Sequence, residues 1–286
     1  MRKQNKKLAF TVIELSVVIL IIAFVIAMAL GSRSIITAAR LSTLRSISAK
    51  SPVYDIADNV LWYDISAKRA FTTYPNNNNL VSSISDVSPN LPVNINMVQL
   101  NSDSQPKFVF DTIDGLPYLY FDGVNDFLTS SRLVYGYELA QPNQMTIIIV
   151  NRHFSGSNRQ FDWGFGTNNR ILSHATHSDN RYYYEVGAQA SGRIISSVLA
   201  SAINSWKIVT MVKKTNGTGF IKANGVPVLN QTSMTSNLNV NDSRTFYMGE
   251  GRFDLREFMI FKRELSSAEI ADIENYLSLK WKIDID

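Results

Sequence analysis

The chain has 286 residues, enough for one large or two small domains, and a formal charge of +4. The four basic residues among the first nine account for the whole excess, because removing them leaves 24 Lys and Arg against 24 Asp and Glu. A neutral remainder gives no general attraction to nucleic acid, and the absence of cysteine excludes disulfides, thiolate metal sites and cysteine nucleophiles.

The first predicted element is a membrane helix. A basic segment, residues 1–9, is followed by an apolar run from Leu15 to Ser32 that contains no charged residue. At about 1.5 Å per residue, such a run is roughly long enough to cross a ~30 Å hydrocarbon layer. Glu14 stands at its start, where a carboxylate without a partner costs about 2.5–3.5 kcal/mol to insert. The pattern therefore predicts a partner for Glu14.

The segment from Lys6 to Glu14, KKLAFTVIE, resembles the N-terminal signal of type IV pilins and pseudopilins. The resemblance implies that a prepilin peptidase cuts between Ala9 and Phe10 and methylates the new amine, so that Glu14 becomes the fifth residue of the mature chain. Ala9 stands where that family usually has Gly. The new α-amino group, with an ordinary pKa of about 7.7–8.0, can be presented to Glu14 by a neighbouring subunit in apolar surroundings. The implied partners are other pilin subunits, the prepilin peptidase and the inner membrane.

Two other interpretations of the N-terminus stay open. A basic segment, an apolar stretch and the small-x-small site Ala27-Met28-Ala29 also fit a secretory signal peptide, and an uncleaved anchor fits as well. However, the apolar run is longer than the about 7–15 residues usual in a signal peptide, and a Glu within it is out of place. The pilin-type signal is therefore favoured.

A stalk is predicted to follow the apolar run. The segment Ser34 to Lys50 lacks Gly and Pro, which favours continuation of the helix. Pro52 disfavours helix at the residue before it and marks the predicted start of a globular part. We therefore divide the chain into a prepilin leader (residues 1–9), a transmembrane and stalk helix (residues 10–51) and a head (residues 52–286).

The head is predicted to be mainly β. Short β-rich runs alternate with clusters of Asn, Asp, Ser and Gly, a pattern typical of a sandwich rather than of βαβ units. The clearest runs are residues 61–63, 107–110, 118–121, 145–151, 182–186, 207–213, 219–223, 226–229, 246–249 and 255–261. Asn224-Gly225 between two of these runs predicts a type I′ hairpin, whereas Tyr74 to Asn79 is a loop by composition.

One helix is predicted to close the chain. Ser266 and Glu269 have the spacing of a capping box, in which each side chain bonds the other residue's backbone N–H. Apolar residues then recur at helical spacing, at Ile270, Ile273, Leu277 and Trp281. We expect this face to pack on the sandwich.

The run Leu116 to Leu128, LPYLYFDGVNDFL, resembles the FDGxNDYL signature of LamG-like, concanavalin A-like jelly-roll domains. Residues 206–209, 223–225 and 254–283 are similar to the Trp strand, the hairpin, and the terminal strand and helix of that family. The match covers residues 58–283 and implies a jelly-roll head with a C-terminal helix. It departs at Asp64 to Lys68, which replaces the family's Asp-x-Ser-Gly turn.

Hydrolase chemistry is not predicted. Glycosidases of this fold place two glutamates about 5 Å apart on one face of a strand, in a Glu-x-Asp-x-Glu pattern, which this chain lacks. Asp254 and Glu257 are three residues apart and are expected to face opposite sides of their strand. We therefore predict that the protein is not an enzyme.

A ligand loop is predicted at Asp122, Asn125 and Asp126. Their oxygen atoms suit calcium, the one cofactor considered, but a turn in which Asp and Asn bond their own backbone gives the same pattern. His174 and His177 have a metal-like spacing, yet zinc needs further ligands and a second shell, so loop or strand positions are favoured.

Aromatic runs are the other candidates for ligand contact. Tyr182 to Tyr184 and Phe161 to Phe165 could stack on sugar rings, as aromatic faces do. Strand alternation turns only every other side chain outward, so half of each run is expected in the core. Aromatic content alone does not identify a lectin.

Together these features predict a minor type IV pilin-like subunit whose helix packs into a filament and whose head is displayed for adhesion to a glycan or host-surface ligand. The precursor is expected in the bacterial inner membrane with its head in the periplasm, and the assembled protein on a pilus or at the cell surface. The alternatives are a pseudopilin of a type II-like secretion system and a membrane-anchored or secreted carbohydrate-binding domain.

Overall fold

The computed structural model describes residues 12–89, 94–154, 159–164, 168–174, 177, 179–197 and 204–285. The cleavage-site residues Ala9 and Phe10 lie outside these ranges. The chain divides into two compact units between Thr43 and Leu44, so the last turn of the first helix belongs to the second unit.

The helices and 3₁₀ turns have the following bounds: α1 Val12–Ser48, η1 Pro52–Tyr54, η2 Lys68–Ala70, η3 Ser102–Ser104, α2 Gly136–Leu139, α3 Gln189–Gly192 and α4 Ser267–Trp281. The strands are β1 Asn59–Asp64, β2 Ser83–Ile84, β3 Met97–Val98, β4 Lys107–Phe110, β5 Pro117–Asp122, β6 Phe127–Ser130, β7 Val134–Tyr135, β8 Met145–His153, β9 Phe161–Trp163, β10 Arg170–His174, β11 Tyr183–Gly187, β12 Arg193–Ile195, β13 Trp206–Lys213, β14 Thr218–Ala223, β15 Val226–Ser233, β16 Ser243–Arg244, β17 Phe246–Gly249 and β18 Arg252–Phe261.

The first unit consists of most of α1. Its large apolar side chains from Val12 to Ile26 are between 44% and 85% exposed, and they lie all around the helix because Val17 to Ile22 is an unbroken apolar run. Along the ranges that the structure describes, no helix reaches the length and apolar character that a membrane crossing requires.

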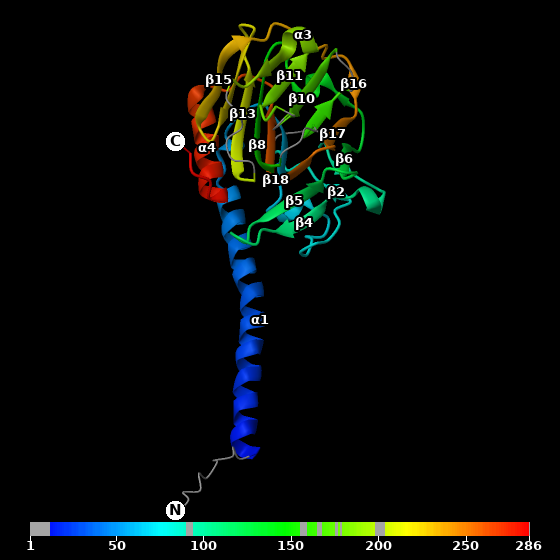
Figure 1. Ribbon diagram of the computed structural model, residues 1–286. Coiled ribbons are helices and arrows are strands. Elements are labelled where there is room, and N and C mark those ends of the chain that lie inside the picture. Colours follow the sequence, from blue (N-terminus) through cyan, green and yellow to red (C-terminus); the bar gives the residue numbers. More distant parts are fainter. Residues whose placement is uncertain are drawn as a thin grey trace, which may run out of the picture. The chain divides into compact units, whose positions relative to one another are not determined.

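The second unit is a β-sandwich (Figure 1). One sheet has the order β15-β14-β13-β8-β18-β5-β4, with β1 paired to the second half of β18, and the other has the order β12-β11-β10-β9-β17-β6-β3-β2. The pairings between the described strands of both sheets are antiparallel. The predicted mainly β head is thus confirmed.

Aromatic side chains from both sheets fill the space between them. Phe121 on β5 stacks on Phe253 on β18, with ring centroids 4.6 Å apart. Phe258 of the same sheet meets Phe161 of the opposite sheet at 5.0 Å. Strand alternation brings these rings together, because on β5 buried residues alternate with half-buried ones. Each ring removes a large apolar surface from water, which makes this cluster the main cohesive element.

The hairpin predicted at Asn224-Gly225 joins β14 to β15. Both residues have positive φ, 51° and 81°, as a type I′ turn requires. Asn and Gly adopt this left-handed conformation more easily than other residues, so the local sequence is sufficient to form the turn.

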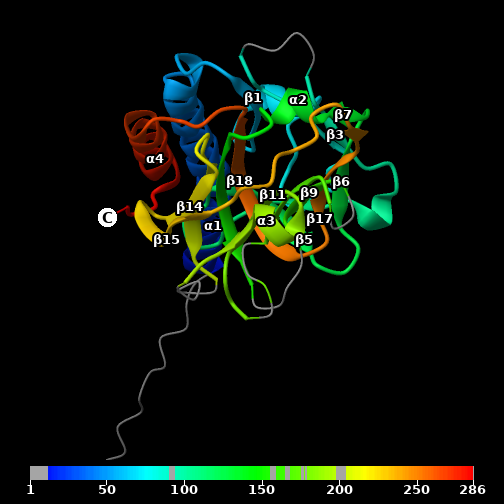
Figure 2. The ribbon, with the colours of Figure 1, turned by 90° about the horizontal axis from the view of Figure 1, so that it is seen from above.

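The C-terminal helix α4 begins with the predicted capping box. Ser266 accepts a hydrogen bond from the Glu269 N–H at 3.2 Å, and Glu269 accepts one from the Ser266 N–H at 2.8 Å. The expected apolar face is buried. Figure 2 shows α4 beside β14, and the Thr210 hydroxyl of β13 donates to Glu274 at 2.6 Å. The helix therefore covers one end of the first sheet.

Two central strands of the second sheet, β9 and β10, were not among the predicted runs. Both carry charged residues that are buried in ion pairs: Asp162 with Arg159 at 2.7 Å, and Arg170 with Glu185 at 2.6 Å. Strands are predicted from the alternation of apolar and polar residues. A buried polar residue interrupts that alternation, so the strand is not recognised.

Candidate functional site

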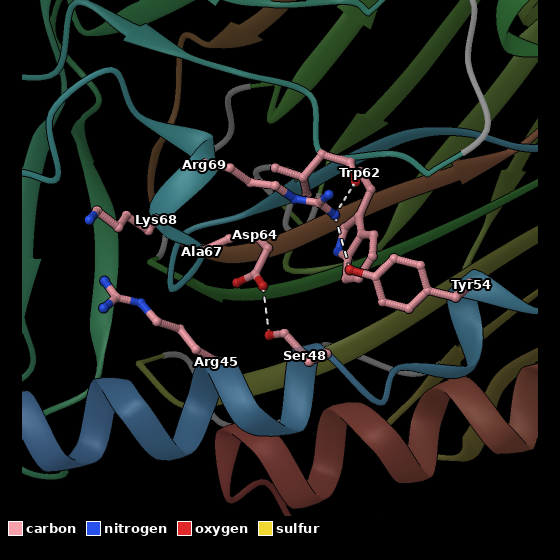
Figure 3. A pocket seen from close by; sticks show the side chains of 10 residues that line it. Arg45, Ser48, Tyr54, Trp62, Asp64, Ala67, Lys68 and Arg69 are labelled. Carbon is pink, nitrogen blue, oxygen red and sulfur yellow. Dashed lines mark hydrogen bonds between the residues drawn. The ribbon is translucent and has the colours of Figure 1, made fainter.

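A pocket of about 290 Å³ opens where the last turn of α1 meets β1, η1 and η2, all within the second unit (Figure 3). Arg45 and Ser48 come from α1, Tyr54 from η1, Asp64 from β1, and Arg69 from η2. The pocket therefore collects side chains from four consecutive elements of the chain.

Three cations surround the pocket. Lys68 and Arg69 are exposed on η2, and Arg69 is oriented by hydrogen bonds from one guanidinium nitrogen to the Tyr54 hydroxyl at 3.0 Å and the Val87 carbonyl at 2.7 Å. Arg45, on the last turn of α1, donates to the Ser66 carbonyl at 3.0 Å. Arginine forks and a lysine ammonium are the side chains that bind carboxylate and phosphate groups most effectively.

Asp64 forms the floor of the pocket but does not cancel this positive charge. Its side chain is 1% exposed and lies 2.8 Å from Lys280 Nζ, which offsets the negative charge. Burial raises the pKa of Asp64, but Lys280 and the hydroxyls of Ser66 and Ser48 outweigh burial and hold the pKa below the ordinary value. The Asp64 carboxylate is thus engaged within the fold by Lys280 and two hydroxyl groups, and the charged groups at the rim of the pocket are the three cations.

Aromatic rings line the side of the pocket toward η1. The Tyr54 ring meets Trp62 edge-on at 5.5 Å, and Tyr54 is 36% exposed whereas Trp62 is 1% exposed. The Trp62 indole N–H donates to Glu257 at 2.8 Å, so its polar edge is already satisfied. Tyr54 is therefore the ring of this pair that can contact a ligand.

The pocket residues were not predicted as a site from the sequence. The available signal was the departure from the LamG-like turn at Asp64 to Lys68, because this is the segment that brings Lys68 and Arg69 to the rim. The contribution of Arg45 depends on where α1 ends, which the turn itself does not reveal.

Glu14, the predicted assembly residue, lies in the first turn of α1 and is exposed. A carboxylate is favourable at this end of a helix because the N-terminal dipole is positive. The roles of Ala9, Phe10 and Glu14 in processing and assembly stay predictions.

The predicted ligand loop forms a tight turn between β5 and β6. One oxygen of Asp122 accepts from the N–H groups of Val124, Asn125 and Asp126 at 2.8, 3.2 and 3.3 Å. Asp126 in turn accepts from the Asp122 N–H at 3.0 Å. Burial raises the pKa of Asp122, but these N–H donors outweigh it and the pKa is lowered overall. One oxygen of Asp122 and one of Asp126 are thus engaged by backbone N–H groups, and calcium binding here stays a prediction.

The turn also depends on Gly123. Its φ is +76°, and a Cβ at this position would lie 2.6 Å from the Arg252 backbone nitrogen. Only glycine fits such a close approach with positive φ. The glycine of the FDG signature is therefore explained in this chain by backbone conformation and by the close approach of Arg252.

The three histidines do not form a metal centre. The His174 and His177 rings lie 5.3 Å apart, edge to face, and both contact Tyr183. His153 is 2% exposed, and burial together with the charge of Lys207 lowers its pKa to about 4, so it is neutral at pH 7. Among the described residues, no group of three or more His, Asp or Glu side chains is arranged to hold a metal ion.

The run from Tyr182 to Tyr184 follows the predicted alternation, whereas the segment Phe161–Trp163 is buried along its whole length. Tyr182 and Tyr184 are buried and Tyr183 between them is half-buried. Phe161 and Trp163 are both buried, and Phe165 lies outside the described residues. Neither run presents a row of rings to solvent in the part described.

The expectation that Asp254 and Glu257 face opposite sides of their strand is wrong. The pairing of β18 with β8 shifts register between Leu255 and Glu257, which makes Arg256 the extra residue of a β-bulge. Both residues form hydrogen bonds with Trp281. Arg256 donates to the Trp281 carbonyl at 3.4 Å, and Glu257 accepts from the Trp281 indole N–H at 2.6 Å. A bulge inserts one residue and so returns Glu257 to the face of the sheet that Asp254 occupies.

The two carboxylates on this face are nevertheless paired with different cations. Asp254 lies 2.6 Å from Arg152, and Glu257 lies 2.7 Å from Lys280. Burial raises the pKa of Asp254 to about 6 despite Arg152. No acid and nucleophile flank an open cleft at this position, and the absence of enzymatic activity stays a prediction.

The comparisons with known proteins find similarity at the level of the fold. Neither a protein-family model nor a curated protein matches the chain. Among solved structures, the receptor-binding domain of botulinum neurotoxin D is 12% identical with a TM-score of 0.54, covering 78% of this chain and 53% of that chain. The binding domain of serotype G is 14% identical with a TM-score of 0.51, covering 78% and 51%.

The crystal structure of the serotype D binding domain gives a similar result, 13% identity and a TM-score of 0.53, covering 76% of this chain and 50% of that chain. This chain thus spans about half the length of the domains it matches. At these identities the likeness defines the class of fold, a β-sandwich with a C-terminal helix.

Proposed function

We propose that the unit from Leu44 onward is a binding module for an acidic glycan, displayed outside the cell by the N-terminal helix. The observation that carries the proposal is the pocket lined by Arg45, Lys68 and Arg69 and by the exposed ring of Tyr54, which lies beside Arg69 (Figure 3). A sugar ring packs on an aromatic face while its carboxylate pairs with a guanidinium, and the charge-assisted bonds supply the specificity.

The fold supports a binding role. Two solved structures that share it are named as the binding domains of botulinum neurotoxin serotypes D and G. Within this class of fold, we propose that the head is a LamG-like, concanavalin A-like jelly roll. The FDG turn around Gly123 supports this assignment. No enzymatic activity is part of the proposed function, in keeping with the ion pairs that occupy Asp254 and Glu257.

The pocket predicts a specific loss of binding. In a glycan array of sialylated and neutral sugars, the full chain is expected to retain acidic glycans, and Lys68→Glu with Arg69→Glu to weaken that retention at least tenfold. Charged hydrogen bonds contribute about 1.5–3 kcal/mol each, and 1.4 kcal/mol corresponds to tenfold in affinity.

Lys282→Glu is the control for this experiment, since Lys282 is exposed just after α4 and outside the pocket. Retention by the double variant equal to that of the wild type would remove the pocket as the ligand site. Running the array with and without calcium tests the loop at Asp122, because a calcium-dependent signal that Asp122→Ala abolishes assigns binding to that loop.

The N-terminal helix has the role of a pilin-type anchor and assembly element in this proposal. Apolar side chains exposed around the helix from Val12 to Ile26 need cover from lipid or from companion helices. The KKLAFTVIE segment supports cleavage after Ala9 and a place for the precursor in the bacterial inner membrane, with the head periplasmic before assembly and at the cell surface after it. A pseudopilin of a secretion system would use the same signal and helix but assemble with other partners. A secreted or simply anchored binding domain would instead differ in where its N-terminus is cleaved.

N-terminal sequencing of the mature protein distinguishes these forms. We expect the sequence to begin at Phe10 with a methylated amine. A start at Leu30 identifies an ordinary secreted domain, and a start at Met1 an uncleaved anchor. Either of these results removes the pilin-type anchor and leaves the binding module unaffected.

A further inference from the structure

A lysine and two carboxylates meet in the interior of the second unit, beneath the pocket. Lys280 Nζ on α4 lies 2.8 Å from Asp64 Oδ2 on β1 and 2.7 Å from Glu257 Oε2 on β18. The three side chains are at most 1% exposed. They come from the first strand, the last strand and the last helix of the sandwich, so only the tertiary fold brings them together.

The surroundings of this triad are aromatic. Glu257 accepts hydrogen bonds from the indole N–H groups of Trp62 and Trp281 at 2.8 and 2.6 Å and from the Tyr276 hydroxyl at 2.9 Å. Burial raises the pKa of Glu257, the direction that makes a carboxylate a better proton acceptor. The ammonium is thus held within hydrogen-bond distance of both carboxylates by buried neighbours.

Asp64 is also prepared for attack by a nucleophile. Its Oδ1 accepts from the Ser66 N–H at 2.9 Å and the Ser66 hydroxyl at 2.6 Å, which are donors suited to the oxyanion of a tetrahedral intermediate. Its Oδ2 accepts from the Ser48 hydroxyl at 2.8 Å and faces Lys280. The two oxygens therefore have different environments: Oδ1 is held by the Ser66 donors, and Oδ2 lies beside the Lys280 ammonium.

We infer that Lys280 and Asp64 form an isopeptide bond, an amide between Lys280 Nζ and the Asp64 side-chain carbon, with Glu257 as the proton carrier. One ammonium proton passes to Asp64 Oδ2 at 2.8 Å, which makes the carboxyl group electrophilic, and the neutral amine then attacks the carboxyl carbon. Glu257 takes a second proton from the nitrogen and passes it to Oδ2. The C–Oδ2 bond breaks, and Oδ2 leaves as water with two of the three ammonium protons, one of them returned by Glu257. The nitrogen keeps the third proton, and no oxidant or other reactant is consumed.

The pocket gives the released water a path out. Asp64 and Ser48 both line it, so Oδ2 departs toward solvent rather than into the core. The fold holds the amine and the carboxyl group together at a high effective concentration, and this proximity favours the amide. The bond would tie β1 to α4 and so close the sandwich between residues 64 and 280.

The test is the intact mass of the folded full chain. The mass is expected to be lower than that of the processed sequence by one water molecule, and tryptic digestion to yield the Asp64 peptide joined to the Lys280 peptide. Glu257→Gln keeps both reacting groups and is expected to reduce the joined fraction at least tenfold, whereas Lys282→Arg, an exposed lysine two residues on, retains it.

Two results would overturn the inference, and neither depends on a variant folding. One is a wild-type mass without the loss of water. The other is a loss of water confined to the Asp64 peptide with a free Lys280 peptide, which identifies a succinimide at Asp64.

Discussion

Subunits with Glu14→Ala are expected to remain in the membrane fraction as cleaved protein and to be missing from sheared filaments. In the pilin-type arrangement Glu14 pairs with the α-amino group of a neighbouring subunit in apolar surroundings. Removing one partner of a buried ion pair costs about 3–5 kcal/mol, which corresponds to at least about 100-fold in the association constant of each contact. Because each subunit repeats this contact, incorporation should be lost almost completely.

The measurement compares the sheared filament fraction with the membrane fraction by immunoblot. Ser16→Ala is the matched control, since Ser16 is exposed two residues further along α1 and its hydroxyl only donates to the Ile13 carbonyl at 2.8 Å. It should incorporate normally. Filaments that contain Glu14→Ala subunits at wild-type levels would show that charge pairing does not drive assembly.

Replacing Arg256 by Met is expected to lower the free energy of unfolding of the second unit by about 3–5 kcal/mol, as for other buried ion pairs that lose one partner. The Arg256 side chain is fully buried, 2.6 Å from Asp114 and 3.8 Å from Asp111. Its guanidinium also lies 3.7 Å from the centre of the Trp206 ring. The variant leaves Asp111 and Asp114 with less compensation and removes the cation from the indole face.

Arg252→Met is the control on the same strand, because Arg252 is exposed at the start of β18. Surface substitutions of this kind usually change stability by about 0.5 kcal/mol or less. Urea unfolding of both variants, followed by tryptophan fluorescence, gives the two differences. A loss below about 1 kcal/mol for Arg256→Met would mean that the buried network of Arg256 contributes little beyond packing.

Several parts of the molecule follow from short stretches of sequence. The type I′ turn at Asn224-Gly225 requires two residues that tolerate positive φ, and the cap of α4 requires Ser266 and Glu269 three positions apart. The alternating burial along β5 and the apolar face of α4 likewise depend on residues that are near neighbours in the chain. Such features depend on interactions within about four residues, which is why the mainly β class and the terminal helix could be predicted.

Other parts could not be read in this way. The bulge at Arg256 overturned the expected orientation of Glu257 relative to Asp254, because a single extra residue reverses the alternation beyond it. Strands β9 and β10 escaped prediction because Asp162 and Arg170 are buried beside the partners that neutralise them. For the bulge and for Arg170 the deciding neighbour lies on another strand, whereas the partner of Asp162 is Arg159, just before β9.

Interactions between residues close in the sequence thus determined the N-terminal helix that contains Glu14, the turns, the cap of α4 and the class of fold. Folding in three dimensions decided which charges meet: Arg45, Lys68 and Arg69 around the pocket, and Asp64, Glu257 and Lys280 beneath it. The physical reason is that a buried charge is stable only beside a compensating group, and sheet pairing supplies that group from a distant part of the chain.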